Sequence, residues 1–113
     1  MKKRKVQDVE VEMGTDNVYA DLGYADADEM LIKAQLVAKI AEIIKRKGIT
    51  QTKAAALLEM PQPKLSNLLG GRFRGFSERR LMDCLTKLGR DVQIVVKAAP
   101  RSRGNGRLSI VFT

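Results

Sequence analysis

The stretch Ile49 to Gly71, ITQTKAAALLEMPQPKLSNLLGG, decides the fold of this chain because it predicts two short helices joined by a tight turn. Thr50 precedes a run with helical spacing, and its hydroxyl can accept a hydrogen bond from an N–H of the first turn. The first helix is therefore expected over residues 51–58. Glu59 and Met60 form the turn. The inward positions of this helix are small or apolar: Ala54, Ala55 and Leu58.

Pro61 and Pro63 predict the start of the second helix, because a first-turn residue needs no N–H for an intrahelical hydrogen bond. This helix is expected over residues 62–69, and Gly70 and Gly71 end it. Leucines spaced three and four residues apart give it one buried face: Leu65, Leu68 and Leu69. The opposite face is polar: Gln62, Lys64, Ser66 and Asn67.

Two helices of two turns each are not stable alone in water, so both must pack on other parts of the chain. The polar face of the second helix carries side chains that form hydrogen bonds with base edges and phosphates. The pattern therefore predicts a helix-turn-helix unit, with residues 62–69 as the helix that enters the major groove of DNA.

The stretch from Gly48 to Gly71 resembles the phage-repressor-like (XRE) family of helix-turn-helix proteins without a gap. The resemblance implies that Gln51 bonds a phosphate and that Gln62 reads a base. One position departs from the family pattern, since the turn residue is often glycine and here it is Glu59. A left-handed conformation there costs a residue with a Cβ atom about 1 kcal/mol.

The loop after the second helix reads Arg72-Phe-Arg-Gly-Phe, which places Arg72 and Arg74 where the phosphates that flank the site would lie. Phe73 and Phe76 are interpreted as core residues rather than as platforms for bases. The residues that we expect to contact DNA are Gln51, Thr52, Gln62, Lys64, Ser66, Asn67, Arg72 and Arg74.

Two further helices are predicted around the central stretch. One covers residues 29–47, where Asp26 or Asp28 can cap it, and the other covers 78–88, where Ser77 can cap it. The apolar stripe of the first is Leu36, Ile40, Ile43 and Ile44. The core face of the second is Leu81, Met82, Leu85 and Leu88.

The composition limits the function classes. The 113 residues carry a formal charge of +8, which points to an anionic partner. With no His and one Cys, a zinc site, a disulfide or His-based catalysis within one chain is excluded. Cys84 is interpreted as a small buried apolar side chain. We expect no enzyme activity, no cofactor, no membrane span and a cytoplasmic location on DNA.

After the last helix the period of the pattern changes to two. Residues 91–97 and 108–113 predict strands, joined by RSRGNGR over residues 101–107. The strands either pair with each other or pair with their copies in a second chain. The expected fold is mainly α, a repressor-like domain of four to five helices with one or two C-terminal β-strands. The expected parts are a flexible basic arm (1–15), the helix-turn-helix domain (16–90), and a dimerisation segment and tail (91–113).

Over residues 16–97 the chain resembles the HigA-like antitoxins of this family. The segments that carry the likeness are NVYADLGYADADEMLIKAQL, the helix-turn-helix stretch and GRFRGFSERRLMDCLTKLGRDVQIVV, in that order. The resemblance implies a small DNA-binding antitoxin that represses its own operon as a homodimer. It also implies a partner, a basic RelE- or HigB-like toxin that cleaves mRNA. A stand-alone regulator without a toxin partner is the alternative, because the helix-turn-helix fits both.

Residues 16–29 contain five acids and no base. Two interpretations stay open. Either the apolar residues of this segment pack on the chain's own helices, or the segment docks a basic toxin. The apolar residues in question are Tyr19, Leu22 and Tyr24, and the acids are Asp16, Asp21, Asp26, Asp28 and Glu29.

Overall fold

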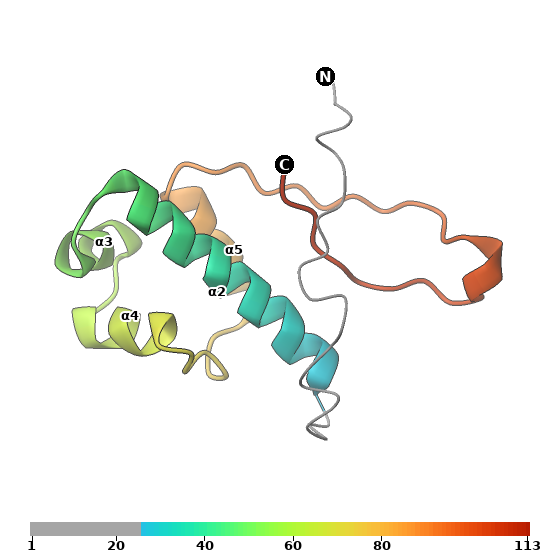
Figure 1. The fold of residues 1–113 in the computed structure, drawn as a ribbon, viewed down its shortest axis with the longest axis horizontal. Coiled ribbons are helices and arrows are strands. Elements are labelled where there is room, and N and C mark those ends of the chain that lie inside the picture. The colour runs from blue at the N-terminus through green and yellow to red at the C-terminus, as the bar shows by residue number, and fades with distance from the viewer. Residues whose placement is uncertain (1–25) are drawn as a thin grey trace. The chain divides into compact units, whose positions relative to one another are not determined.

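The computed structural model describes residues 26–113, and these fall into two compact units that meet in sequence between Val92 and Gln93. Among the described residues, the first unit, which ends at Val92, holds four helices, and the second, which begins at Gln93, holds one short 3-10 helix. The helices are α2 (Ala27–Lys47), α3 (Gln51–Leu58), α4 (Gln62–Leu69), α5 (Glu78–Lys87) and η2 (Arg101–Arg103) (Figure 1).

The four larger helices confirm the mainly helical prediction. Long helix α2 contacts α4 and α5, and α3 contacts α4 and α5. The side chains at the centre of this packing are almost fully buried: Ile40, Ile43, Leu65, Leu68 and Leu81. Burying one such side chain contributes about 1.5–3 kcal/mol, so five of them explain how two helices of eight residues stay folded.

Helix α2 begins two residues earlier than predicted, at Ala27. Asp26 occupies the N-cap position, but its carboxylate makes no capping hydrogen bond, which corrects the prediction of a side-chain cap there. The carboxylate pairs instead with the guanidinium of Arg74. The helix ends as predicted at Gly48, which has the left-handed torsions φ 66° and ψ 25° that glycine adopts without strain.

The turn between α3 and α4 places Glu59 in a backbone conformation that is uncommon for a residue other than glycine. Glu59 lies in the left-handed region at φ 58° and ψ 46°, where its N–H donates to the carbonyls of Ala55 and Ala56. At the other end of α3 the hydroxyl of Thr50 accepts from the N–H of Lys53 at 3.1 Å, the predicted cap. The loop after α4 is anchored by Phe73 and Phe76, each 5% exposed, so both are core residues as interpreted.

Two positions predicted to lie in the core are only partly covered. Leu69 and Met82 are half-buried, because each stands at the edge of its helix's apolar face. Cys84 is buried as interpreted, at 3% exposure.

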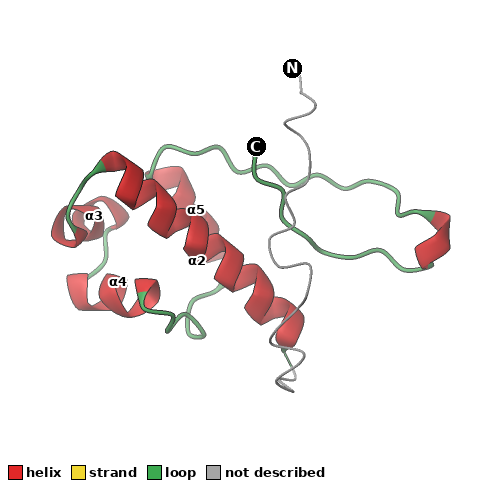
Figure 2. Ribbon diagram, in the orientation of Figure 1, coloured by secondary structure: helices red, strands yellow, loops and turns green. Residues whose placement is uncertain are grey.

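The two predicted C-terminal strands are not confirmed. Neither residues 91–97 nor residues 108–113 form a strand in the described chain (Figure 2). A strand exists only where its backbone groups pair with a neighbouring strand, and the described residues provide no such ladder. The second unit runs out to η2 and back, and most of its large apolar side chains stay exposed, although Ile110 and Phe112 are half-buried. The most exposed are Ile94 at 80%, Val95 at 75%, Val96 at 91% and Leu108 at 79%.

No helix among residues 26–113 is long and apolar enough to cross a bilayer.

Candidate DNA-binding surface

Helix α4 has two sharply different faces. Leu65 and Leu68 have no exposed surface and fix the helix against the core. The four polar residues predicted for its outer face are all exposed: Gln62, Lys64, Ser66 and Asn67. The helix therefore presents hydrogen-bonding side chains from a rigid support, which is what base recognition in a groove requires.

A hydrogen bond joins the starts of the two helices of the helix-turn-helix. The side-chain N–H of Gln62 donates to the side-chain oxygen of Gln51 at 3.3 Å. The amide of Gln62 has a second N–H and a carbonyl oxygen left, and a bidentate contact with adenine uses one donor and one acceptor. Gln51 thus orients Gln62, while its own amide N–H groups stay available for a phosphate oxygen.

A second pair lies at the other end of α4. The guanidinium of Arg72 donates to the side-chain oxygen of Asn67 at 3.1 Å. This bond holds an exposed cation of the following loop against the last turn of the recognition helix. Thr52 is exposed in the first turn of α3, one residue after Gln51. Of the eight residues predicted to contact DNA, six therefore lie on α3 or α4. A seventh, Arg72, is held against α4 by its hydrogen bond with Asn67.

Arg74 is the eighth, and the structure gives it a different role. Its guanidinium forms an ion pair with Asp26. Its backbone carbonyl accepts a hydrogen bond from Nζ of Lys33 at 3.0 Å, and Lys33 also pairs with Glu29 at 3.0 Å. The first two turns of α2 therefore hold the loop that follows α4. Contact between Arg74 and a phosphate stays a prediction.

Lys33 was not predicted to have a structural role, although the sequence around it indicates one. It is only 5% exposed, which is rare for a lysine without partners. It lies seven residues before Ile40, on the inward stripe of α2, and four residues after Glu29. A lysine on an apolar stripe with an acid one turn earlier is typical of a buried charge that ties two elements together.

Arg80 was also missed. Its guanidinium lies 5.1 Å from the centre of the Phe76 ring, and Nζ of Lys64 lies 5.5 Å from the same ring. Both distances are within the range of cation–π interactions. Phe76 therefore brings a cation from α5 beside a cation of the recognition helix, which adds positive charge next to the polar face of α4.

Comparisons with known proteins agree with this geometry. Residues 18–97 match a protein family described as Helix-turn-helix domain. A solved structure described as an XRE family transcriptional regulator is 41% identical to this chain. The alignment covers 78% of this chain and 99% of that one, with a TM-score of 0.74. The chain belongs to the XRE family of helix-turn-helix proteins. No curated protein matches it significantly.

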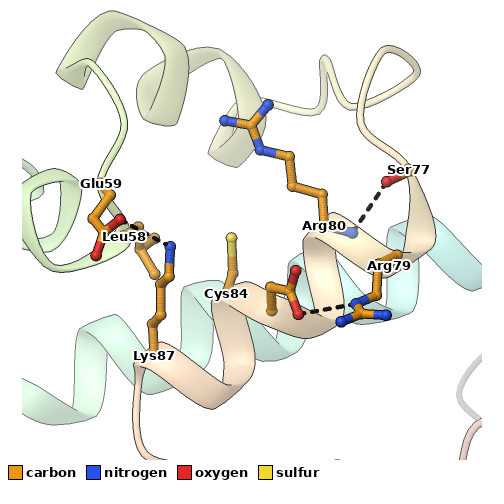
Figure 3. Close-up of a pocket in the computed structure, with 8 residues that line it drawn as sticks. Leu58, Glu59, Ser77, Arg79, Arg80, Cys84 and Lys87 are labelled. Atoms are coloured by element: carbon orange, nitrogen blue, oxygen red, sulfur yellow. Dashed lines mark hydrogen bonds and ion pairs between the residues drawn. The ribbon is translucent and has the colours of Figure 1, made fainter.

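This XRE chain has one further feature near the turn, a hollow of about 330 Å³ between the α3–α4 turn and α5 (Figure 3). Two ion pairs lie in its wall: Lys87 lies 3.5 Å from Glu59, and Arg79 lies 3.2 Å from Asp83. Burial raises the pKa of the Cys84 thiol in its wall, so the reactive thiolate is disfavoured. Among residues 26–113 no cluster of His, Cys, Asp and Glu could hold a metal ion. The Lys87–Glu59 ion pair joins α5 to the turn.

Proposed function

We propose that the chain is a sequence-specific DNA-binding transcriptional regulator whose helix α4 enters the major groove. The observation that supports this most strongly is the Gln51–Gln62 hydrogen bond, 3.3 Å long, on the exposed side of the helix-turn-helix. It pre-orients one side chain with a free donor and acceptor, as base reading requires. The likeness to an XRE family transcriptional regulator supports the same role.

The binding free energy comes mainly from charge. The formal charge of +8 attracts duplex DNA, and Lys64 and Arg72 lie on and beside the recognition helix to meet phosphates. Selection of duplexes from a random library by the full chain should enrich one sequence, and the affinity for it should fall steeply with added salt. A library that stays random after several rounds would contradict the proposal.

The regulator acts as a homodimer. One recognition helix reads about one half-site, and a two-fold pair of helices one turn of DNA apart gains specificity by symmetry. The exposed apolar run at Ile94, Val95 and Val96 supports self-association through the second unit, since contiguous exposed apolar side chains mark sites of protein–protein contact. Ile94→Pro removes one backbone donor from any strand formed there. Sedimentation should show a weaker dimer for this variant, and a dimer of wild-type strength would argue against strand pairing.

The finer role is that of an antitoxin that represses its own operon and neutralises a RelE- or HigB-like toxin. The likeness of residues 16–97 to HigA-like antitoxins supports it, together with the acidic segment 16–29. Most of that segment lies outside the described residues. Of its acids, Asp26 pairs with Arg74 and Glu29 pairs with Lys33, so these two carboxylates already serve the chain's own fold.

The test of the antitoxin role is co-expression of the chain with the protein encoded next to it. The role predicts a stable complex and loss of that complex when Tyr19→Ala is introduced, while the melting temperature and DNA binding hold. A chain that binds its selected duplex but no neighbouring protein is instead a stand-alone repressor, the alternative that shares the same DNA-binding surface.

A further inference from the structure

Helix α5 carries a cation whose position its own helix does not explain. Arg79 and Arg80 both stand in the first turn of α5, where the positive end of the helix dipole disfavours cations. Arg79 is neutralised by Asp83, which lies 3.2 Å away and one turn further along. Among residues 26–113 the guanidinium of Arg80 forms no ion pair, and Figure 3 shows its side chain pointing away from that of Arg79. The charge of Arg80 is therefore available to a ligand.

The ring of Phe76 fixes where this cation lies. Phe76 is 5% exposed, so the core of the helical unit holds its ring in place. The guanidinium of Arg80 lies 5.1 Å from the ring centre, and Nζ of Lys64 lies 5.5 Å from it. These cation–π contacts restrain both side chains, which lowers the entropy that they lose when they bind a ligand.

Lys64 and Arg80 form a pair of like charges. Because both lie within 5.5 Å of one ring centre, their charges are at most about 11 Å apart. This separation is close to the screening length of salt, about 10 Å at 0.1 M, so the two cations repel each other. Neither forms an ion pair within the part of the chain that the structure describes. An anion that meets both cations relieves this repulsion.

We propose that Arg80 contacts a phosphate of the DNA strand that Lys64 also contacts, with Phe76 as the positioning residue for both. Lys64 lies exposed on α4, the helix proposed to enter the major groove, so the cation beside it meets the strand that borders this groove. A guanidinium group suits this ligand, because its N–H groups match the oxygens of a phosphate. The inference rests on the proposed DNA-binding function and adds α5 to the surface that binds the duplex.

The first test compares two neighbouring arginines on the selected duplex and on a random duplex. Arg80→Gln should weaken binding to both by about three- to ten-fold and lower the salt slope by about 0.9, the value of one phosphate contact. Arg79→Gln is the control, since it removes the same charge from the same turn, from a side chain that is 81% exposed and paired with Asp83. The control should keep the salt slope of the wild type. Equal losses in the two variants would overturn the proposal, because only the total charge would then matter.

A duplex with one neutral phosphate locates the contact. An uncharged methylphosphonate group replaces each phosphate of the selected duplex in turn, and the affinity is measured by fluorescence anisotropy. At the phosphate that Arg80 contacts, the neutral group should weaken the wild type but should not weaken the Arg80→Gln variant further. Lys64→Gln should lose its sensitivity at a nearby phosphate of the same strand. An Arg80→Gln variant that keeps every sensitivity of the wild type would overturn the contact.

A double-mutant cycle tests the role of the ring. In a Phe76→Leu background, Arg80→Gln should weaken binding by a smaller factor than in the wild type, because the ring no longer holds the guanidinium. A ring that only fills the core would leave this factor unchanged, which would overturn its positioning role. Phe76→Met serves in the same way if Phe76→Leu melts below the assay temperature.

The same measurements separate this inference from the proposed function. If the wild type prefers one sequence, but Arg80→Gln binds like Arg79→Gln and keeps the phosphate sensitivities of the wild type, the inference is wrong while the DNA-binding function stands. If the wild type prefers no sequence in the selection, the proposed function itself is wrong.

Discussion

The two units of this chain treat similar apolar side chains in opposite ways. In the helical unit, Leu65, Leu68 and Leu81 have no exposed surface, because they lie where the four helices pack together. In the second unit Ile94 and Val96 are 80% and 91% exposed. The difference shows that an apolar pattern fixes a structure only where its partner lies in the same chain.

The largest expected effect tests this contrast by truncating one side chain in each unit. Leu65→Ala should lower the free energy of unfolding by about 2–5 kcal/mol, because it leaves a cavity between α4 and the core. Ile94→Ala should change it by less than about 0.5 kcal/mol, as expected of an exposed site. Denaturant titration at a protein concentration low enough to keep monomers separates the two. Similar losses for both variants would show that Ile94 is packed in the folded chain.

A smaller effect is expected at the tie between α2 and the loop after α4. Lys33→Met removes the cation that binds Glu29 and the carbonyl of Arg74, and should lower the free energy of unfolding by about 1–3 kcal/mol. The control is Arg46→Met, whose side chain is 70% exposed and pairs with Glu42 on the surface, and which should cost under about 1 kcal/mol. Thermal melts of both variants at one pH test the prediction. A Lys33→Met variant with the melting temperature of the wild type would show that the bonds of Lys33 do not stabilise the fold.

The smallest effect is expected at the turn. Glu59→Asn should raise the free energy of unfolding by up to about 1 kcal/mol, because asparagine tolerates the left-handed conformation better. The substitution also removes the ion pair between Glu59 and Lys87, which is 3.5 Å long. Because the Glu59 side chain is 75% exposed, the loss of this ion pair costs little. Glu59→Ala removes the same carboxylate without easing the backbone and should bring no gain. Equal stability of the two variants would show that strain at residue 59 is negligible.

Most of the helical unit could be predicted from the sequence, for reasons that are local. Thr50 and Ser77 mark helix starts with their own hydroxyls, Gly48 marks an end, and leucine spacing identifies the buried face of α4. The polar face of α4 follows from the same spacing, so its exposure could be predicted as well.

Contacts between residues far apart in sequence could not be predicted in the same way. Asp26 meets Arg74 across 48 positions and Lys33 reaches the same residue across 41, so no local pattern reveals either bond. Asp26 stands at the N-cap position of α2, where a capping hydrogen bond is expected. Only the folded position of the loop after α4 shows that its carboxylate pairs with Arg74 instead. The prediction of the C-terminal strands was not confirmed for a related reason. An alternating pattern shows which side chains share a face of a strand, but it does not show which other strand pairs with it.

The central claim is that α4 reads base edges through Gln62, and its most direct test is the ratio of specific to non-specific binding. Anisotropy titrations of the selected duplex and a random duplex are compared for the wild type, Gln62→Ala and Arg72→Ala. Gln62→Ala should lose about 1–3 kcal/mol on the selected duplex and little on the random one. Arg72→Ala should weaken both about equally and lower the salt slope by about 1, since a phosphate contact carries no sequence information. A Gln62→Ala variant with an unchanged ratio would contradict base reading by this residue.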